Sequence, residues 1–163
     1  MNGQKIVYDI LEHLKIPFDY YAHPAVPTVE EASKYWKDIL ATHCKNLFFR
    51  NHKGNRHYLV IAECSKNLPI RLLESFLKQG KLTFASEERM WKYLGLKPGS
   101  VSPFGLLNDE EHHVHVFLDA DLKLSEKISF HPNDNTASLV IPYTGFLKYL
   151  EYVGNTYEYI DLG

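Results

Sequence analysis

Residues 45–63 read KNLFFRNHKGNRHYLVIAE and carry the clearest structural signal in the chain. Two runs rich in aromatic and aliphatic residues, KNLFFRN and RHYLVIAE, are separated by HKGN. Gly54 supplies the backbone freedom that a tight turn requires. This spacing is typical of a β-hairpin, so we predict two neighbouring antiparallel strands.

Helical patterns flank this hairpin on both sides. Apolar residues recur at helical spacing in residues 3–14, and Pro17 ends that pattern. Further helices are predicted from about residue 29, over 67–80, over 87–94 and over 145–153. Their expected caps and stops are the Thr28–Glu31 capping box, Pro69, Gly80, Ser86, Gly95 and Thr144.

Further strands are expected at residues 18–23, 81–85, 113–120, 127–131, 137–142 and 156–160. Helices and strands are therefore mixed without regular βαβ alternation. This order predicts an α+β fold with a largely antiparallel or mixed sheet. A chain of 163 residues favours one core, so we expect a single domain over residues 1–163.

Composition narrows the class of protein. The formal charge is −2, from 18 Lys and Arg against 20 Asp and Glu, which argues against a generally basic coat for nucleic acid. The N-terminal residues lack an apolar core of signal-peptide length, and no stretch reaches the roughly 20 apolar residues that span a bilayer. We expect a soluble cytoplasmic protein with no membrane partner. Its two cysteines, Cys44 and Cys64, are then expected to be reduced, although a disulfide between them stays open.

Lys45 is the first candidate for chemistry, because it begins the strand on the same side as Leu47 and Phe49. A lysine there can be an edge residue whose stem packs while its ammonium reaches water. It can also be a fixed positive charge at the rim of a pocket, suited to a phosphodiester or a hydroxyl. The strand pattern alone leaves both readings open.

The segment GLKPGSVSPFGLLND, residues 95–109, holds three glycines, two prolines and two serines. Such a loop is either a plain turn after a helix or a built binding surface. Backbone N–H groups exposed by glycines can bind a carbonyl oxygen or a developing oxyanion. Walker and Rossmann glycine motifs are both absent from the sequence, and neither serine of the loop has a base beside it in sequence.

Histidines raise the question of a metal site. His113 and His115 alternate along one predicted strand, and His131 falls in a strand that we place next to it. Zinc takes such ligands, but no H-E-x-x-H motif or cysteine pair supports a site. Packing or surface histidines are the default, and we predict no metal and no cofactor. Cys44 is a poor nucleophile candidate, because it should face away from Lys45.

Three segments together resemble the YbaK/ProX family of freestanding prolyl-tRNA editing proteins. They are THCKNLFFRNHKGNRHYLVIAE (42–63), LGLKPGSVSPFGLLND (94–109) and FHPNDNTASLVI (130–141). The resemblance runs over nearly the whole chain. It is strongest to the branch called ProXp-ala or PrdX, which hydrolyses alanine mischarged onto proline tRNA.

The resemblance implies a compact α/β sandwich with a curved mixed sheet and flanking helices. It also implies the site residues. Lys45 matches the functional lysine, and His131 the pocket histidine. Gly95, Pro98, Gly99 and Ser100 match the G-x-x-P-G loop that lies against the ester. Asn46 follows the lysine as in the family, although strand alternation points it to the other side. The implied substrate contacts further include Val26, Thr28 and Val29 as pocket walls, with Ser102 and Phe104 in the loop.

The implied reaction is hydrolysis of Ala-tRNA(Pro), with the tRNA(Pro) acceptor end as partner and transient association with prolyl-tRNA synthetase. An aminoacyl ester is already activated, so orienting a water and stabilising the oxyanion could suffice. The terminal adenosine hydroxyl would assist, and a small pocket would admit alanine but exclude proline. Three alternatives stay open: a deacylase for Cys-tRNA(Pro) or another aminoacyl-tRNA, a module that binds a tRNA end without hydrolysis, and a zinc hydrolase.

Overall fold

The predicted hairpin is present in the computed structural model, which describes residues 1–25, 34, 35, 37 and 39–163. Strand β2 (Thr42–Arg50) pairs antiparallel with β3 (His57–Glu63), in a register that runs from Cys44↔Glu63 to Arg50↔His57. Gly54 has φ +72° in the connecting turn. The Asn51 side chain closes this turn, because its Oδ1 accepts the backbone N–H groups of Asn55 and Arg56.

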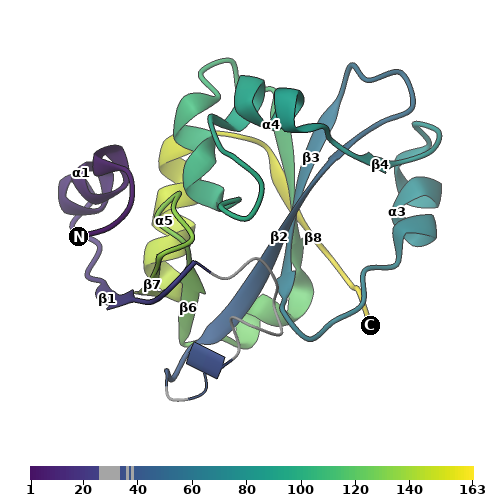
Figure 1. Ribbon diagram of the computed structural model, residues 1–163. Coiled ribbons are helices and arrows are strands. Elements are labelled where there is room, and N and C mark those ends of the chain that lie inside the picture. Colours follow the sequence, from purple (N-terminus) through teal and green to yellow (C-terminus); the bar gives the residue numbers. More distant parts are fainter. Residues whose placement is uncertain (26–33, 36, 38) are drawn as a thin grey trace.

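Strand β2 joins two halves of one mixed sheet (Figure 1). In the described part of the chain, eight strands follow the order β1-β7-β6-β2-β3-β5-β8, with β4 also paired to β2. The β2–β6, β3–β5 and β5–β8 pairs are parallel, and the other pairs are antiparallel. The remaining strands are β1 (Asp19–Ala22), β4 (Thr83–Phe84), β5 (Val114–Asp119), β6 (Lys127–Phe130), β7 (Ala137–Pro142) and β8 (Tyr157–Ile160).

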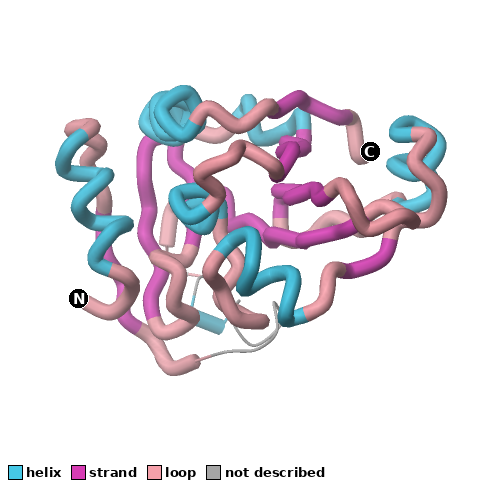
Figure 2. Tube along the Cα trace, turned by 90° about the horizontal axis from the view of Figure 1, so that it is seen from above, coloured by secondary structure: helices cyan, strands magenta, loops and turns pink. Residues whose placement is uncertain are grey.

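Helices cover both faces of this sheet. They are α1 (Lys5–His13), α3 (Ile70–Leu77), α4 (Glu87–Leu94) and α5 (Tyr143–Val153), with the 3₁₀ turns η1 (Pro103–Asn108) and η2 (Ala120–Leu124). Helices α1 and α5 lie together on one side, and α3 lies at the opposite side (Figure 1). The view from above shows the strands running between these helical groups (Figure 2). The expected α+β domain with a mixed sheet and flanking helices is therefore confirmed.

Side-chain alternation on the central strands builds two cores. Phe48 and Leu118 belong to the larger core, which α1, α4, α5 and η1 cover. Phe49 and Phe117, each one position away, belong to a smaller core that Leu73 of α3 completes. Because successive strand residues point to opposite faces, each central strand supplies both cores.

Most predicted helix limits are correct to within a turn. Ser86 caps α4 by accepting the N–H of Arg89 at 3.2 Å, and Gly95 ends that helix with φ +64°. Two predicted limits are wrong. Helix α3 ends at Leu77, three residues before Gly80, and the following Lys78 has a left-handed backbone conformation. Helix α5 begins at Tyr143 after Pro142, so Thr144 lies inside the helix and does not cap it.

No helix within the described ranges has the length and apolar character needed to cross a bilayer. The Thr28–Glu31 capping box lies outside the described residues.

Candidate active site

Lys45 lies on the face of β2 opposite the larger core, as the alternation predicts. Leu47 and Phe49 follow it on this face and pack in the smaller core, whereas Cys44 and Phe48 face the larger one. The Lys45 ammonium donates a hydrogen bond to the carbonyl oxygen of Lys66. A lysine that is half-buried and held at its charged end is not a freely snorkelling edge residue.

Strand register relates Lys45 to His131. Strands β2 and β6 run parallel, with Thr42 beside Ile128 and His43 beside Ser129. Lys45 follows His43 by two residues, and His131 follows Ser129 by two. Alternation along β2 places Lys45 on the same face as His43, whose partner is Ser129; strand β6 ends at Phe130, one residue before His131.

His131 has a defined protonation state. Its Nδ1 lies 2.7 Å from the Ala137 carbonyl oxygen, which can only accept, so Nδ1 carries the proton. Burial lowers the pKa of His131 below its usual value, with a smaller opposing effect of the Ala137 bond. The imidazole is therefore neutral at pH 7, and its Nε2 offers a lone pair.

His23 lies beside His131 and is a residue that the sequence analysis did not select. The two rings are 5.9 Å apart, and His23 Nε2 is 2.9 Å from Ser138 Oγ. Tyr35 stacks against the other side of the His23 ring at 5.9 Å. A signal for this pair exists in the sequence, because both histidines end a strand and precede a proline, at His23–Pro24 and His131–Pro132.

The glycine-rich loop lies against the turn that follows His131. Gly99 has φ +87°, and a Cβ at this position would lie 3.3 Å from Asn135 Nδ2. The loop and the turn enclose a polar cavity of about 340 Å³. Its lining includes Gly95, Lys97 and Ser100 from the loop side, residues 133–136 from the turn, and the exposed Trp91.

Backbone donors in this loop are not equivalent. The Ser100 N–H donates to the Lys97 carbonyl at 3.1 Å and closes a turn within the loop. The Ser100 N–H is therefore engaged within the loop, which leaves Gly99 as the candidate backbone donor. Pro98 is exposed and holds the loop before Gly99.

Ser102 and Phe104 support the loop from inside. Ser102 is fully buried, and its Oγ accepts the Phe104 N–H and donates to Asn133 Oδ1, both at 3.0 Å. Phe104 is 1% exposed and packs edge-on against Tyr149. Both side chains are enclosed by the protein, and Ser102 fixes the loop to the 131–136 turn through Asn133.

The other predicted contacts divide in two. Val26, Thr28 and Val29 lie outside the described residues. Asn46 faces the larger core, away from Lys45, and its Oδ1 is buried with no hydrogen-bond partner among the described residues.

The histidines considered for a metal site are dispersed. Strands β3 and β2 separate β5 from β6, so the expectation that His131 neighbours His113 and His115 is wrong. His113 bonds His57 instead, and His115 contacts Thr156 and Glu158. Across the described residues, no group of three or more His, Cys, Asp or Glu side chains is arranged to hold a metal ion. Cys44 and Cys64 are both free thiols, and burial raises the pKa of each.

A larger cavity of about 490 Å³ lies between α1 and α5, lined in part by Ile10, Leu106 and Tyr152. None of the predicted site residues lines it. Of the predicted site residues, those of the glycine-rich loop border the polar cavity of about 340 Å³.

Comparisons with known proteins show the family of the chain. Residues 23–149 match the model of the aminoacyl-tRNA editing domain. The chain is 40% identical over 162 residues to "Prolyl-tRNA editing protein ProX" of Acetoanaerobium sticklandii, covering 99% of both chains. It is 30% identical over 148 residues to "Prolyl-tRNA synthetase associated domain-containing protein 1" of Bos taurus, covering 89% of this chain and 86% of the other.

The fold also matches a solved structure described as a candidate trans-editing enzyme for prolyl tRNA synthetase. The TM-score is 0.71 at 19% identity, over 99% of this chain and 98% of the other. At that identity the match shows the fold alone. The family model and the bacterial relative show more: the chain belongs to the aminoacyl-tRNA editing domain family, and the expected class of enzyme, an aminoacyl-tRNA deacylase, is confirmed.

Proposed function

We propose that the protein edits prolyl-tRNA in trans by hydrolysing Ala-tRNA(Pro) to alanine and free tRNA. The observation that supports this proposal is the close approach of Gly99 to Asn135 in the turn after His131, beside the parallel β2–β6 pair that precedes Lys45 on one strand and His131 on the other. A backbone donor, a neutral imidazole and a fixed ammonium are the groups that ester hydrolysis at a tRNA end needs. The 40% identical relative named for prolyl-tRNA editing supports this substrate class.

His131 is assigned to the attacking water. Its Nδ1 is occupied by the Ala137 carbonyl, so Nε2 is the atom that accepts a hydrogen bond from the water. Because burial keeps the ring neutral, this acceptor persists through the physiological pH range. The free hydroxyl of the terminal adenosine would share the proton transfer, as in the family that the sequence resembles.

Gly99 is assigned to the ester carbonyl. Its positive φ turns the peptide in a way that other residues adopt only with strain, and the absent side chain leaves room for close approach. An N–H donor placed where the oxyanion develops contributes to catalysis because it is already oriented. Ser100 stabilises this arrangement through its bond to the Lys97 carbonyl.

Lys45 is assigned to the terminal nucleotide. An ammonium has three N–H donors, of which the Lys66 carbonyl takes one. The others can bind the terminal phosphate or the ribose hydroxyls, as a point charge on a rigid strand. The ester is activated in the substrate itself, so this scheme requires no metal and no cofactor.

Selectivity for alanine is assigned to pocket size, with Val26, Thr28 and Val29 as walls. A small pocket excludes the bulkier proline well. The same pocket rejects a side chain smaller than its proper substrate less strongly. We place the reaction in the cytoplasm, with the tRNA(Pro) acceptor end as partner and prolyl-tRNA synthetase as a transient one.

The test is a deacylation panel on purified protein with tRNA(Pro) charged with Ala, Cys, Ser or Pro. Ala-tRNA(Pro) should be hydrolysed fastest and Pro-tRNA(Pro) spared, with no loss on chelation. Lys45→Ala should reduce kcat/KM by at least about 100-fold, since it removes a charged contact to substrate. Lys81→Ala, an exposed lysine beyond α3, is the matched control.

Each alternative has its own signature in this panel. Faster hydrolysis of Cys-tRNA(Pro) than of Ala-tRNA(Pro) would indicate a cysteine-specific deacylase. Tight tRNA binding without turnover would indicate a binding module, and loss of activity on chelation would indicate a zinc hydrolase. Undiminished activity of Lys45→Ala would remove the lysine from the mechanism.

A further inference from the structure

The turn that follows β3 holds the charged end of Lys45. In the hairpin register Lys45 lies opposite Ala62, and the chain then turns at residues 63–66, where the Lys66 N–H bonds the Glu63 carbonyl at 3.1 Å. The Lys66 carbonyl oxygen of this turn accepts the Lys45 ammonium. The position of that oxygen therefore decides where the ammonium of Lys45 points.

Asp119 fixes this turn from the neighbouring strand. It ends β5, and its side chain is 0% exposed. One carboxylate oxygen, Oδ2, accepts the Glu63 N–H at 3.1 Å. The other, Oδ1, accepts the Lys66 ammonium at 2.7 Å and the Asp121 N–H at 3.1 Å. Both ends of the turn are thus bonded to one buried carboxylate.

Lys66 completes the arrangement. Its ammonium also lies 2.6 Å from Asp121 Oδ2, so it bridges a buried and an exposed carboxylate. A buried carboxylate is costly unless its lone pairs are satisfied, and here each oxygen has a donor. Removing the Lys66 side chain would leave Asp119 without its counter-charge and would free the end of the turn that carries the Lys66 carbonyl.

We propose that Asp119 and Lys66 are positioning residues for Lys45: they hold the 63–66 turn so that the Lys66 carbonyl orients the Lys45 ammonium toward the tRNA end. This inference rests on the proposed function, since it matters only if Lys45 touches substrate. Neither residue contacts substrate itself. A long lysine side chain loses rotamer entropy when it is held in one position, so fixing it before binding lowers the cost of binding.

Kinetics of Lys66→Met should show this role. The contact of Lys45 with the terminal nucleotide forms in the ground state, so loosening it should raise KM for Ala-tRNA(Pro) by roughly 5- to 10-fold, with a smaller change in kcat. Lys66→Arg should stay within about 2-fold of wild type, because a guanidinium can bridge both carboxylates. Asp9→Asn, which removes the exposed Lys5–Asp9 ion pair at 2.8 Å, is the matched control and should change nothing.

A second readout follows Lys45 directly. Limited reductive methylation with formaldehyde and cyanoborohydride, read by peptide mass spectrometry, gives a rate for each lysine. Lys45 should react several-fold faster in Lys66→Met and in Asp119→Asn than in wild type, while exposed Lys81 and Lys127 keep their rates. Circular dichroism confirms folding, and Lys66→Met carries the test if Asp119→Asn does not fold.

The outcomes separate the two proposals. A wild-type protein that deacylates no aminoacyl-tRNA overturns the proposed function, whatever the lysine rates show. An active wild type whose KM is unchanged by Lys66→Met, or an unchanged Lys45 methylation rate in that variant, overturns the positioning role alone.

Discussion

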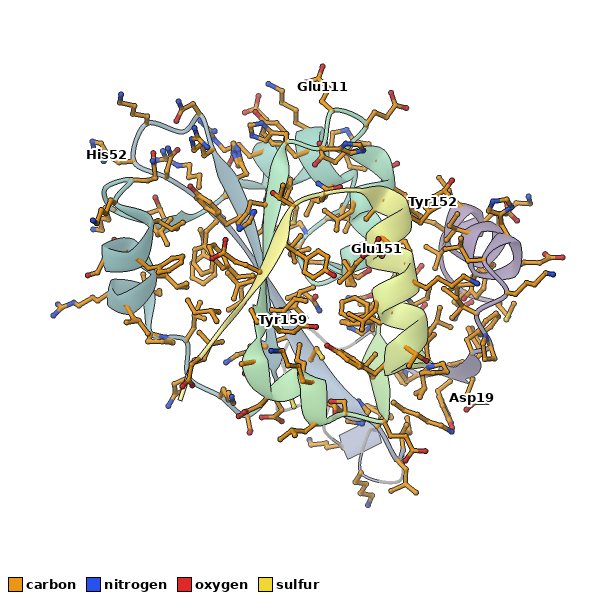
Figure 3. The ribbon with its side chains drawn as sticks, turned by 180° about the vertical axis from the view of Figure 1, so that it is seen from behind. Asp19, His52, Glu111, Glu151, Tyr152 and Tyr159 are labelled. Carbon is orange, nitrogen blue, oxygen red and sulfur yellow. The ribbon has the colours of Figure 1, made fainter. Side chains whose placement is uncertain are left out.

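Two pairs of histidines lie at separate places on the same sheet and have different chemistry. His57 and His113 lie at the hairpin end of the central strands, whereas His23 and His131 lie where β2 and β6 separate. The two regions can be located in Figure 3 by two labelled residues on opposite sides of the molecule. His52 lies in the loop of the hairpin that contains His57, and Asp19 begins β1, the strand that His23 follows. Burial is the first cause that lowers the pKa of both His57 and His131, and for His57 the value falls to about 4.

The difference lies in the ring nitrogens that are occupied. Arg89 donates to His57 Nε2 at 3.1 Å, so Nδ1 carries the proton and donates to His113 Nε2 at 2.8 Å. The ring is also packed between Phe48 and Tyr93. His131, in contrast, uses Nδ1 alone, and within the described residues its Nε2 has no hydrogen-bond partner. A lowered histidine pKa therefore reports burial alone, and the role proposed for His131 depends in addition on its Nε2 atom.

The same substitution in both pairs tests this difference most strongly. His131→Asn keeps a donor near the Nδ1 position for the Ala137 carbonyl but removes the Nε2 acceptor, so kcat/KM should fall about 100-fold with an unchanged melting temperature. His57→Asn should leave kcat/KM unchanged and lower the free energy of unfolding by about 2 kcal/mol, because buried partners lose their bonds. Deacylation kinetics and urea unfolding of both variants measure this. A stability loss in His131→Asn without a rate loss would contradict the assignment.

Stability at mild acid pH gives the next largest effect. Between pH 6.5 and pH 4 the unfolded chain protonates His57, whereas the folded protein keeps it neutral. The unfolded state then binds more protons, so stability falls as the pH falls through this window. Between pH 7.5 and pH 5 the free energy of unfolding should drop by roughly 2 kcal/mol from this residue. Urea unfolding at the two pH values, compared between wild type and His57→Asn, isolates that contribution. An equal pH dependence in both proteins would rule it out.

Two glycines allow a matched test of the loops. Gly99 and Gly54 both have positive φ, +87° and +72°. Alanine at position 99 should cost about 1 kcal/mol of stability, and alanine at position 54 should cost more, because its Cβ would lie 2.8 Å from Arg89 Nη2. Only Gly99→Ala should also lower kcat/KM, by roughly 5- to 10-fold, because its Cβ presses on Asn135 and displaces the proposed oxyanion donor. Equal activity of the two variants would exclude the Gly99 N–H from the reaction.

Ser100 should show the smallest effect. Its backbone N–H closes the loop turn, and alanine preserves that bond. Ser100→Ala should therefore change kcat/KM by less than about 3-fold, since no mechanism step is assigned to the hydroxyl. A loss comparable to that of Lys45→Ala would show that the Ser100 hydroxyl takes part and that the backbone account is incomplete.

Local signals in the sequence predicted most elements of the fold. The hairpin, the Ser86 cap and the Gly95 stop each depend on a few adjacent residues, and all three are present. The order of strands in the sheet depends on contacts between distant segments, so the adjacency expected for β5 and β6 failed. Thr144 failed as a cap because Pro142 sets the backbone just before α5.

For the candidate site, alternation alone correctly gave the direction of Lys45 relative to Cys44. The Asp119–Lys66 pair and the buried roles of Ser102 and Phe104 could not be read from sequence. They depend on which groups become enclosed when separate loops meet, and no local pattern encodes that enclosure. His23 is an intermediate case. Its His-Pro dipeptide recurs at His131 and could be seen in the sequence, but nothing in the sequence showed that the two histidines lie beside each other.

The parallel β2–β6 pair has a consequence for biosynthesis. Lys45 is translated long before His131, and β7, which pairs with β6, ends only at Pro142. Pairing of distant segments delays folding until the later segment has emerged from the ribosome. The residues of the proposed site are therefore complete only after this pairing. A nascent chain, itself joined to tRNA by an ester bond, lacks the complete proposed site until residues up to Pro142 have emerged.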